Sequence, residues 1–126
     1  MDVKFFKCLH CGNVAVKPWD AGVPLMCCGE KMTELVANTT DAATEKHVPV
    51  VTVDGANVHV EVGSTLHPMT EEHLIAFIVL VTEKGYQVAQ LTAADEPKAD
   101  FAVAAGDKPL KVYEYCNLHG LWVASI

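Results

Sequence analysis

The stretch Tyr115-Cys116-Asn117-Leu118-His119-Gly120-Leu121-Trp122 places two soft metal ligands in one short turn. Cys116 and His119 are three residues apart, a glycine follows them, and apolar residues typical of strands lie on both sides. Thiolate and imidazole are ligands for zinc, iron and copper. The stretch therefore predicts a metal site at a turn between two strands, with further ligands drawn from elsewhere in the chain.

Most of the chain that precedes this turn carries strand signals. Residues 48–53 and 57–62 flank Asp54-Gly55, a pair that favours the tight turn of a β-hairpin. Short strands with no convincing helix predict an all-β fold, built as an antiparallel sandwich. The other strands are expected at 74–82, 86–92, 101–104, 111–115 and 121–126, with a polar loop at 95–100.

Composition and charge exclude several classes of protein. The chain has 126 residues, of which 51% are hydrophobic, enough for one ordinary domain with a small appendage. A net charge of −7 argues against nucleic acid as a partner, because phosphate binding needs a basic face. The longest apolar run, residues 74–81, is too short to cross a bilayer, and no secretory signal is visible. A cytoplasmic protein without a membrane partner is expected.

Residues 1–36 contain four of the five cysteines, Cys8, Cys11, Cys27 and Cys28. In a cytosolic chain such a cluster favours metal binding over disulfides. Cys27 and Cys28 are adjacent, so they can reach one ion only if the backbone turns sharply, which Gly29 permits. Four thiolates predict a tetrahedral zinc or iron site.

The same segment has too few apolar residues to fold without that metal. We expect two short hairpins gathered around the ion, and residues 37–46, which are small and polar, as a linker to a second domain. The apolar residues available for burial are Val3, Phe5, Val14, Val16, Trp19 and Leu35.

The six histidines fall into two groups. His59 alternates with valines on a strand and is expected on the solvent face, and His10 lies inside the first cysteine pair and is expected to point outward. The others lie at strand ends or in loops, where the sites of a sandwich are built. Together with Cys116 they would make a five-coordinate centre whose open sixth position indicates chemistry at the metal. These four are His47, His67, His73 and His119.

Two other kinds of protein fit parts of this pattern. A blue-copper-like electron carrier would use Cys116, two histidines and a weak axial methionine such as Met69, which leaves two histidines unexplained. A zinc-held binding module would use the same ligands without redox chemistry.

The chain resembles the desulfoferrodoxins, the two-iron class of superoxide reductases, over its whole length and in the order of the family's motifs. The resemblance implies a desulforedoxin- or rubredoxin-like metal-bound domain at 1–36 and an immunoglobulin-like antiparallel sandwich at 37–126. It also implies a cytoplasmic homodimer with a rubredoxin-like electron donor. The motifs, besides the terminal stretch, are Cys8-x-x-Cys11-Gly12-Asn13, Cys27-Cys28-Gly29, Glu45-Lys46-His47-Val48-Pro49, His67-Pro68-Met69 and Glu72-His73.

The same resemblance implies the activity, one-electron reduction of superoxide to hydrogen peroxide, and the residues that perform it. One iron would be held by the four cysteines of residues 1–36, and a second by the four histidines in its equatorial plane with Cys116 axial. Glu45 and Lys46 match a flexible glutamate and lysine of the family's active site. The chain departs from many relatives after His73, where it reads Leu74-Ile75-Ala76-Phe77; this affects the surroundings of a ligand and not the ligand set.

Overall fold

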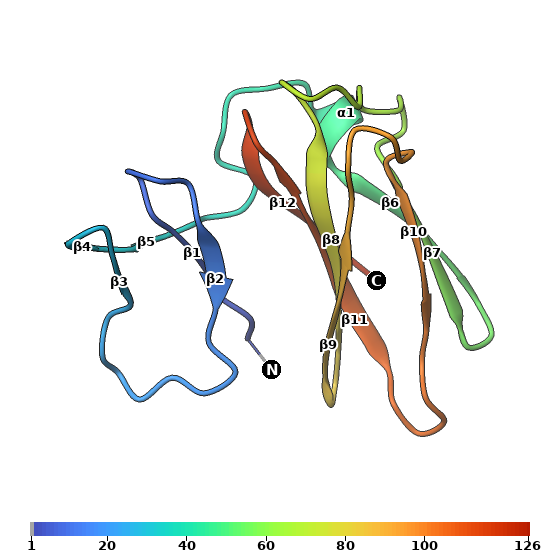
Figure 1. The fold of residues 1–126 in the computed structure, drawn as a ribbon. Coiled ribbons are helices and arrows are strands. Elements are labelled where there is room, and N and C mark those ends of the chain that lie inside the picture. The colour runs from blue at the N-terminus through green and yellow to red at the C-terminus, as the bar shows by residue number, and fades with distance from the viewer. Residues whose placement is uncertain (1) are drawn as a thin grey trace. The chain divides into compact units, whose positions relative to one another are not determined.

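The structure, a computed structural model, describes residues 2–126, which form two compact units (Figure 1). The first is Asp2–Val36 and the second is Ala37–Ile126. Strands account for nearly all of the regular structure in both units, and every strand pair is antiparallel. The prediction of an all-β fold is confirmed.

The first unit has two small sheets. Their strands are β1 (Phe5–Lys7), β2 (Val14–Val16) and β5 (Thr33–Glu34), in the order β2-β1-β5, and the separate pair β3 (Met26–Cys27) and β4 (Glu30–Lys31).

The apolar core of the first unit is minimal, because Phe5 and Cys8 are its buried hydrophobic residues. The expected burial of Trp19 is wrong: its side chain is 86% exposed. Polar contacts hold the surrounding loop instead, since the Lys17 Nζ donates hydrogen bonds to Asp20 Oδ1 at 3.0 Å and to the Val23 carbonyl oxygen at 2.7 Å.

The second unit is a sandwich of seven strands in two sheets, the arrangement of an immunoglobulin-like domain. One sheet has the order β10-β7-β6, with β6 (Pro49–Asp54), β7 (Asn57–Val62) and β10 (Lys98–Ala102). The other has the order β12-β11-β8-β9, with β8 (Ile75–Thr82), β9 (Gly85–Gln90), β11 (Pro109–Cys116) and β12 (Gly120–Ser125).

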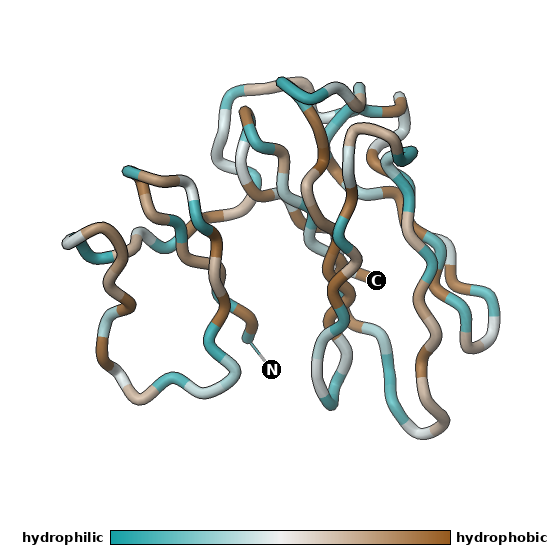
Figure 2. The backbone as a smooth tube through the Cα atoms, viewed as in Figure 1, coloured by the Kyte–Doolittle hydropathy of each residue, from teal (hydrophilic) through white to brown (hydrophobic). Residues whose placement is uncertain are grey.

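The core of the sandwich lies between its two sheets and follows the alternation of side chains along each strand. Figure 2 shows hydrophobic residues running along β8 and hydrophilic ones at the turn that follows it. Cys116 belongs to this core, so the predicted metal ligand at the end of β11 is set into the buried interior of the unit. The buried cluster is Val58, Val60, Val62, Ile75, Ile78, Leu80, Phe101, Val112 and Cys116.

Strand β10 begins at Lys98, so the predicted loop at 95–100 is wrong in its last three residues. Lys98 and Asp100 pair with Glu61 and His59 of β7. Their polar side chains occupy the solvent side of a regular strand, and Lys98 lies 3.7 Å from Glu61. The sequence resembled a loop because two of the three residues assigned to it wrongly, Lys98 and Asp100, are charged.

The predicted linker at 37–46 is tied to the sandwich at both ends. The backbone N–H of Asn38 donates to the Leu121 carbonyl oxygen at 3.0 Å, and its side chain accepts a hydrogen bond from Val123 N at 2.9 Å. The segment then enters α1 (Thr44–His47), a single helical turn that the sequence did not predict. A four-residue turn is too short to show helical periodicity. Within residues 2–126 there is no helix of the length and apolar character needed to cross a membrane.

His59 forms a polar cluster on the outer face of β7, as expected of a solvent-facing residue. Its Nδ1 lies 2.8 Å from Asp100 Oδ1, and its Nε2 lies 3.2 Å from Glu61 Oε1. Both hydrogen bonds raise the pKa of His59 above its ordinary value of 6.5, and the bond with Asp100 has the larger effect. The charged cluster therefore stabilises the fold below the unfolded pKa, and this contribution is lost as pH rises through the folded pKa.

We accordingly expect His59→Gln to lower the free energy of unfolding at about pH 5 by no more than about 1 kcal/mol, the scale of exposed ion pairs. At about pH 9, where the imidazole is neutral in both states, the variant and the parent should unfold alike. Urea denaturation at the two pH values measures the difference. An equal loss at both pH values would show that His59 contributes packing and not charge.

Candidate metal centres

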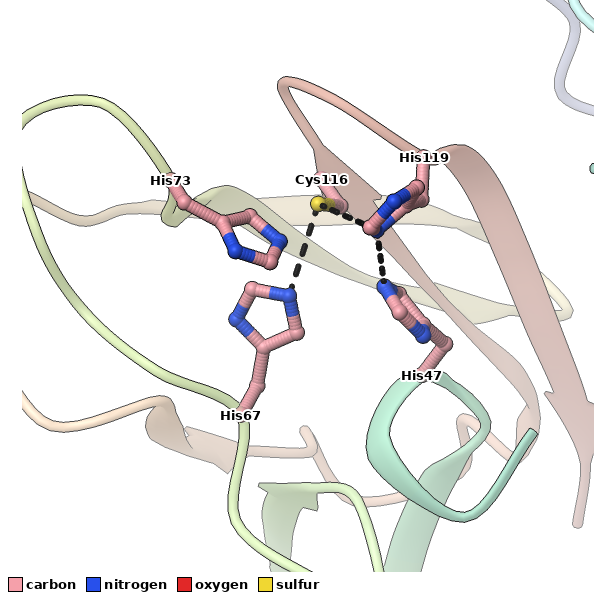
Figure 3. A group of neighbouring side chains, drawn as sticks. All are labelled: His47, His67, His73, Cys116 and His119. Carbon is pink, nitrogen blue, oxygen red and sulfur yellow. Dashed lines mark hydrogen bonds between the residues drawn. The ribbon is translucent and has the colours of Figure 1, made fainter. Parts of the chain in front are cut away.

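Five side chains from three segments of the chain meet at one end of the sandwich, and we call them the His4Cys centre (Figure 3). One potential ligand atom from each lies within 4.8 Å of those of all the others. They are His47 at the end of α1, His67 in the loop after β7, His73 in the loop before β8, Cys116 at the end of β11, and His119 in the turn that follows.

The four imidazoles of this centre form a closed ring. Neighbouring ring centroids are 4.9 Å apart for His47 and His67, 4.5 Å for His67 and His73, 5.1 Å for His73 and His119, and 4.9 Å for His119 and His47. Each neighbouring pair of rings is close to perpendicular, at 75° to 85°. Such an arrangement brings one nitrogen from each ring close to the others, so the four imidazoles could bind one ion together.

Hydrogen bonds show which nitrogen of each ring is available to a metal. In His47 and His67 the Nδ1 is bonded to the carbonyl oxygens of Ala43 (2.7 Å) and Pro68 (2.6 Å), which leaves Nε2 for the centre. This is the usual way in which a ligating histidine is oriented. The Nε2 of His73 is buried without a hydrogen-bond partner among the described residues. In His119 it is Nδ1 that faces His47 Nε2, at 3.1 Å.

Burial favours the neutral, metal-binding form of three of the rings, those of His47, His67 and His73. His47 and His67 are buried, and desolvation lowers the pKa of His67 to about 4. Burial is also the main cause of the lowered pKa of His47 and of His73. Neutral imidazoles offer a free electron pair at neutral pH, so the donor set fits a transition-metal ion.

Cys116 is the fully buried member of the centre. Its Sγ lies 3.4 Å from His67 Nε2 and 3.9 Å from His119 Nδ1. Burial raises the pKa of the thiol, while backbone N–H groups of Leu118 and His119 act in the opposite direction. A buried thiol of this kind becomes a thiolate when a cation replaces its proton, which is the behaviour of a metal ligand.

Glu114 is a buried carboxyl group that is absent from the candidates predicted by sequence. It is 0% exposed, and its two carboxyl oxygens have no hydrogen-bond partner among the described residues. Desolvation raises its pKa to about 9, so it is neutral in the folded protein at pH 7. The sequence did contain a signal of this burial: along β11, Glu114 lies two residues from both Val112 and Cys116 and therefore on the same, inward-facing side of the strand.

Glu45 and Lys46 are exposed on α1, next to the ligand His47. The Glu45 carbonyl oxygen accepts hydrogen bonds from Thr65 N at 2.9 Å and from Ser64 Oγ at 3.2 Å. This ties the turn to the loop that begins at Gly63. The approach is close, because a Cβ added at Gly63 would lie 2.6 Å from the Glu45 carbonyl oxygen.

Met69 lies outside the His4Cys centre. Its Sδ accepts a hydrogen bond from Ile75 N at 3.3 Å, and the side chain packs against the core. The sulfur needed as an axial ligand in the blue-copper alternative is therefore engaged by the backbone.

The four cysteines of the first unit make a second cluster, the four-cysteine centre, whose sulfurs all lie within 4.8 Å of one another. The Sγ atoms of Cys11 and Cys27 are 3.6 Å apart, and those of Cys27 and Cys28 are 4.0 Å apart. The sharp turn expected there is present, with positive φ at Cys28 (54°) as well as at Gly29 (75°). These residues connect β3 and β4 as a two-residue hairpin, so adjacent cysteines reach the same point.

The thiols of the four-cysteine centre differ in acidity. The pKa of Cys8 is lowered to about 6, mainly because it accepts a hydrogen bond from Cys11 N at 3.4 Å. The pKa of Cys28 is raised to about 12, mainly by the side chain of Cys11. Four sulfurs this close cannot all be thiolates without a cation among them, so the cluster fits a tetrahedral thiolate-bound ion.

Comparisons with known proteins agree with this pair of centres. A sequence profile described as Desulfoferrodoxin matches residues 39–125. A relative named desulfoferrodoxin from Clostridium acetobutylicum is 44% identical over 126 residues, covering 99% of this chain and 98% of its own. The solved superoxide reductase of Treponema pallidum is 41% identical, with a TM-score of 0.83 over 98% of this chain and 99% of its own.

A shorter relative matches a smaller part of the chain. The superoxide reductase of Giardia intestinalis, described as 1Fe-SOR, is 35% identical with a TM-score of 0.57. The match covers 66% of this chain and 98% of the Giardia protein. Its two ligand clusters, its sandwich and these similarities together show that this chain belongs to the desulfoferrodoxin family.

Proposed function

We propose that this chain is a superoxide reductase, which converts superoxide to hydrogen peroxide with one electron and two protons. The observation that carries the proposal is the ring of four imidazoles with one buried thiol. Five protein ligands leave one of six octahedral positions without a protein ligand, as in a centre that reacts with a small molecule. Two solved relatives are described as superoxide reductases.

We assign the ligands of two irons to the two centres. The four histidines and Cys116 would hold an iron at the His4Cys centre, which would supply the electron and a binding position for superoxide. The four-cysteine centre holds the other iron through Cys8, Cys11, Cys27 and Cys28. Imidazole and thiolate suit iron, and the first unit has too small a core to fold on packing alone.

The reaction can be tested by its electron balance. A reductase consumes one electron from a donor for each superoxide and yields one hydrogen peroxide, with no dioxygen. A dismutase yields dioxygen together with hydrogen peroxide and consumes no donor. Measuring donor oxidation, peroxide and dioxygen in the same assay separates the two; dioxygen release without donor consumption would overturn the proposal.

Metal analysis separates the proposal from its alternatives. Two irons per chain with thiolate-to-iron absorption support the reductase. One copper would indicate an electron carrier, and zinc alone a binding module. The gathering of all four histidines and the engagement of Met69 both argue against the copper carrier.

Lys46 is proposed to attract the substrate. Residues 1–36 carry four lysines and four acidic residues, so their charges cancel. Residues 37–126 carry five lysines and twelve acidic residues, so the net charge of −7 belongs entirely to this unit. An anion is repelled by such a unit unless a local cation draws it in. Lys46 is next to His47, and after burial its charge is among the causes that lower the pKa of both His47 and His73.

Replacing Lys46 with alanine is expected to slow the second-order capture of superoxide at low salt by about 2- to 10-fold and to flatten its dependence on ionic strength. Pulse radiolysis over a range of salt concentrations measures both effects. Lys84→Ala is the matched control, because Lys84 is exposed in the turn after β8, at the opposite end of that strand from His73. Equal rates for the two variants would show that only net charge matters.

Glu45 is proposed as a further residue of this site, whose carboxylate would be available as a ligand to a ferric iron held there in the absence of superoxide. Its backbone is held by Ser64 and Thr65, while its side chain is exposed.

We further propose a desulforedoxin-like domain at 1–36 and a reductase domain at 37–126, a rubredoxin-like donor, a homodimer and a cytoplasmic location. Large apolar side chains exposed on the first unit, among them Leu9 and Met26, support self-association.

A further inference from the structure

Asn117 follows Cys116 at the point where β11 leaves its sheet. The pairing of β11 with β8 is irregular between Tyr115 and Cys116, and the last pair is Cys116 with Ile75. Beyond this pair one segment continues toward His119 and the other leads back toward His73. Asn117 is exposed and lies between two ligands of the His4Cys centre along the chain.

Three hydrogen bonds connect Asn117 to the segment that carries His73. Its side-chain Oδ1 accepts from Leu74 N at 3.0 Å, and its Nδ2 donates to the Glu72 carbonyl oxygen at 2.9 Å. Its backbone N–H donates to the Leu74 carbonyl oxygen at 3.2 Å. The amide side chain thus binds the residue before His73 and the residue after it.

The backbone of His73 itself is held from its own loop. Its N–H donates to Thr70 Oγ1 at 3.0 Å, and its carbonyl oxygen accepts from Thr70 N at 2.9 Å. Thr70 therefore shapes the loop locally, while Asn117 connects that loop to the strand that ends at Cys116.

The ring of His73 depends on this support more than the rings of His47 and His67 do. His47 and His67 are each oriented by a hydrogen bond between Nδ1 and a backbone carbonyl oxygen. For His73 the described residues show no such hydrogen bond from Nδ1, because the hydrogen bonds of this residue are made by its backbone, and its Nε2, the nitrogen left for the centre, is buried and unpaired. The placement of this imidazole consequently depends on where its backbone is held.

We propose that Asn117 is a positioning residue that sets the distance and direction of His73 relative to Cys116. Its side chain does not reach the ligand atoms; it acts through the two peptide groups beside His73. The inference rests on the proposed assignment of the His4Cys centre as a metal site, and its test does not depend on the reductase activity.

The test compares Asn117→Ala and Asn117→Asp in the iron-loaded protein. Alanine removes both side-chain hydrogen bonds, and aspartate replaces the donor with an oxygen that faces the Glu72 carbonyl oxygen. Loss of an outer-shell contact typically weakens metal binding by about 10- to 100-fold. We expect iron to leave the His4Cys centre at least about 10-fold faster when excess EDTA is added, with an altered Cys116-to-iron absorption band. The four-cysteine centre of the same chain should keep its iron and its spectrum.

Asn38→Asp is the matched control. Asn38 is also an exposed asparagine of the second unit that binds a backbone segment with both arms, here the N–H and carbonyl oxygen of Val123. Its φ of 61° is tolerated by aspartate. This control adds the same charge and removes the same kind of donor, yet it should leave iron release unchanged.

Three outcomes would overturn the inference: unchanged release in both Asn117 variants, equal acceleration in Asn38→Asp, or equal loss from both centres. Should the alanine variant not fold, the aspartate variant, which retains the bond from Leu74 N, carries the test alone. Faster iron release in a protein that shows no superoxide reduction would uphold the positioning role and reject the proposed function.

Discussion

Cys116→Ser is expected to lower the metal affinity of the His4Cys centre by at least about 100-fold, the upper end of what loss of a single outer-shell contact costs. The thiol is 0% exposed and its Sγ lies 3.4 Å from His67 Nε2. A serine hydroxyl does not become an anion there, so the metal loses the thiolate that balances its charge. Iron content per chain and the loss of the Cys116-to-iron absorption band measure the effect.

Cys8→Ser is the matched variant, because Cys8 is the buried ligand of the other centre. It should empty the four-cysteine centre and loosen the first unit while the His4Cys centre stays loaded. The two variants together assign each absorption band to one centre. Full iron occupancy of the His4Cys centre in Cys116→Ser would contradict the assignment of Cys116 as a ligand.

Gly63→Ala is expected to lower the free energy of unfolding by about 1–3 kcal/mol, the usual cost of overpacking a close contact. A Cβ at this position would lie 2.6 Å from the Glu45 carbonyl oxygen, 3.0 Å from that of Val48 and 3.1 Å from the carbonyl carbon of Lys46. All three atoms belong to backbone, so no flexible side chain can move aside. Relief requires a shift of the turn that carries His47, and weaker metal binding should accompany the loss of stability. Urea denaturation and iron content measure the two effects.

Gly85→Ala separates this crowding from the general effect of replacing glycine. Gly85 begins β9, and a Cβ there would meet nothing within 4 Å. Alanine at a compatible glycine commonly stabilises a protein by about 0.4–1 kcal/mol. The stability of Gly85→Ala should therefore equal or exceed that of the parent. If Gly63→Ala lowers the free energy of unfolding no more than Gly85→Ala does, then lack of space does not constrain the approach of Gly63 to the turn that carries His47.

Local patterns were sufficient for much of the sandwich. The Asp54-Gly55 turn predicted the hairpin, and the observed strands β6 and β7 pair Asp54 with Asn57 across it. The strand β8 was predicted from its continuous apolar run, because a strand that is buried on both faces does not alternate between apolar and polar residues. These features depend on near neighbours in the chain, which a sequence displays directly.

Other features depended on partners far away in the sequence. The start of β10 was missed because Lys98 and Asp100 are stabilised as strand residues by Glu61 and His59 across the sheet. Burial of Trp19 was wrongly expected because hydrophobicity alone does not show whether a small unit has an interior to receive it. The buried Glu114 was missed for the opposite reason, since a carboxylate normally indicates a solvent-facing position.

The sequence by itself determined the ligand chemistry, because the number, type and order of cysteines and histidines are properties of the chain. It was also enough to place Cys11 near Cys8 and His119 near Cys116, since short turns bring such residues together. Only the tertiary structure decided that His119 presents Nδ1 while His47 and His67 present Nε2. Only the tertiary structure revealed the contacts of Gly63 and Asn117. Those choices are made where loops from distant parts of the chain meet, and the space and hydrogen-bond partners available there exist only after the sheets have packed.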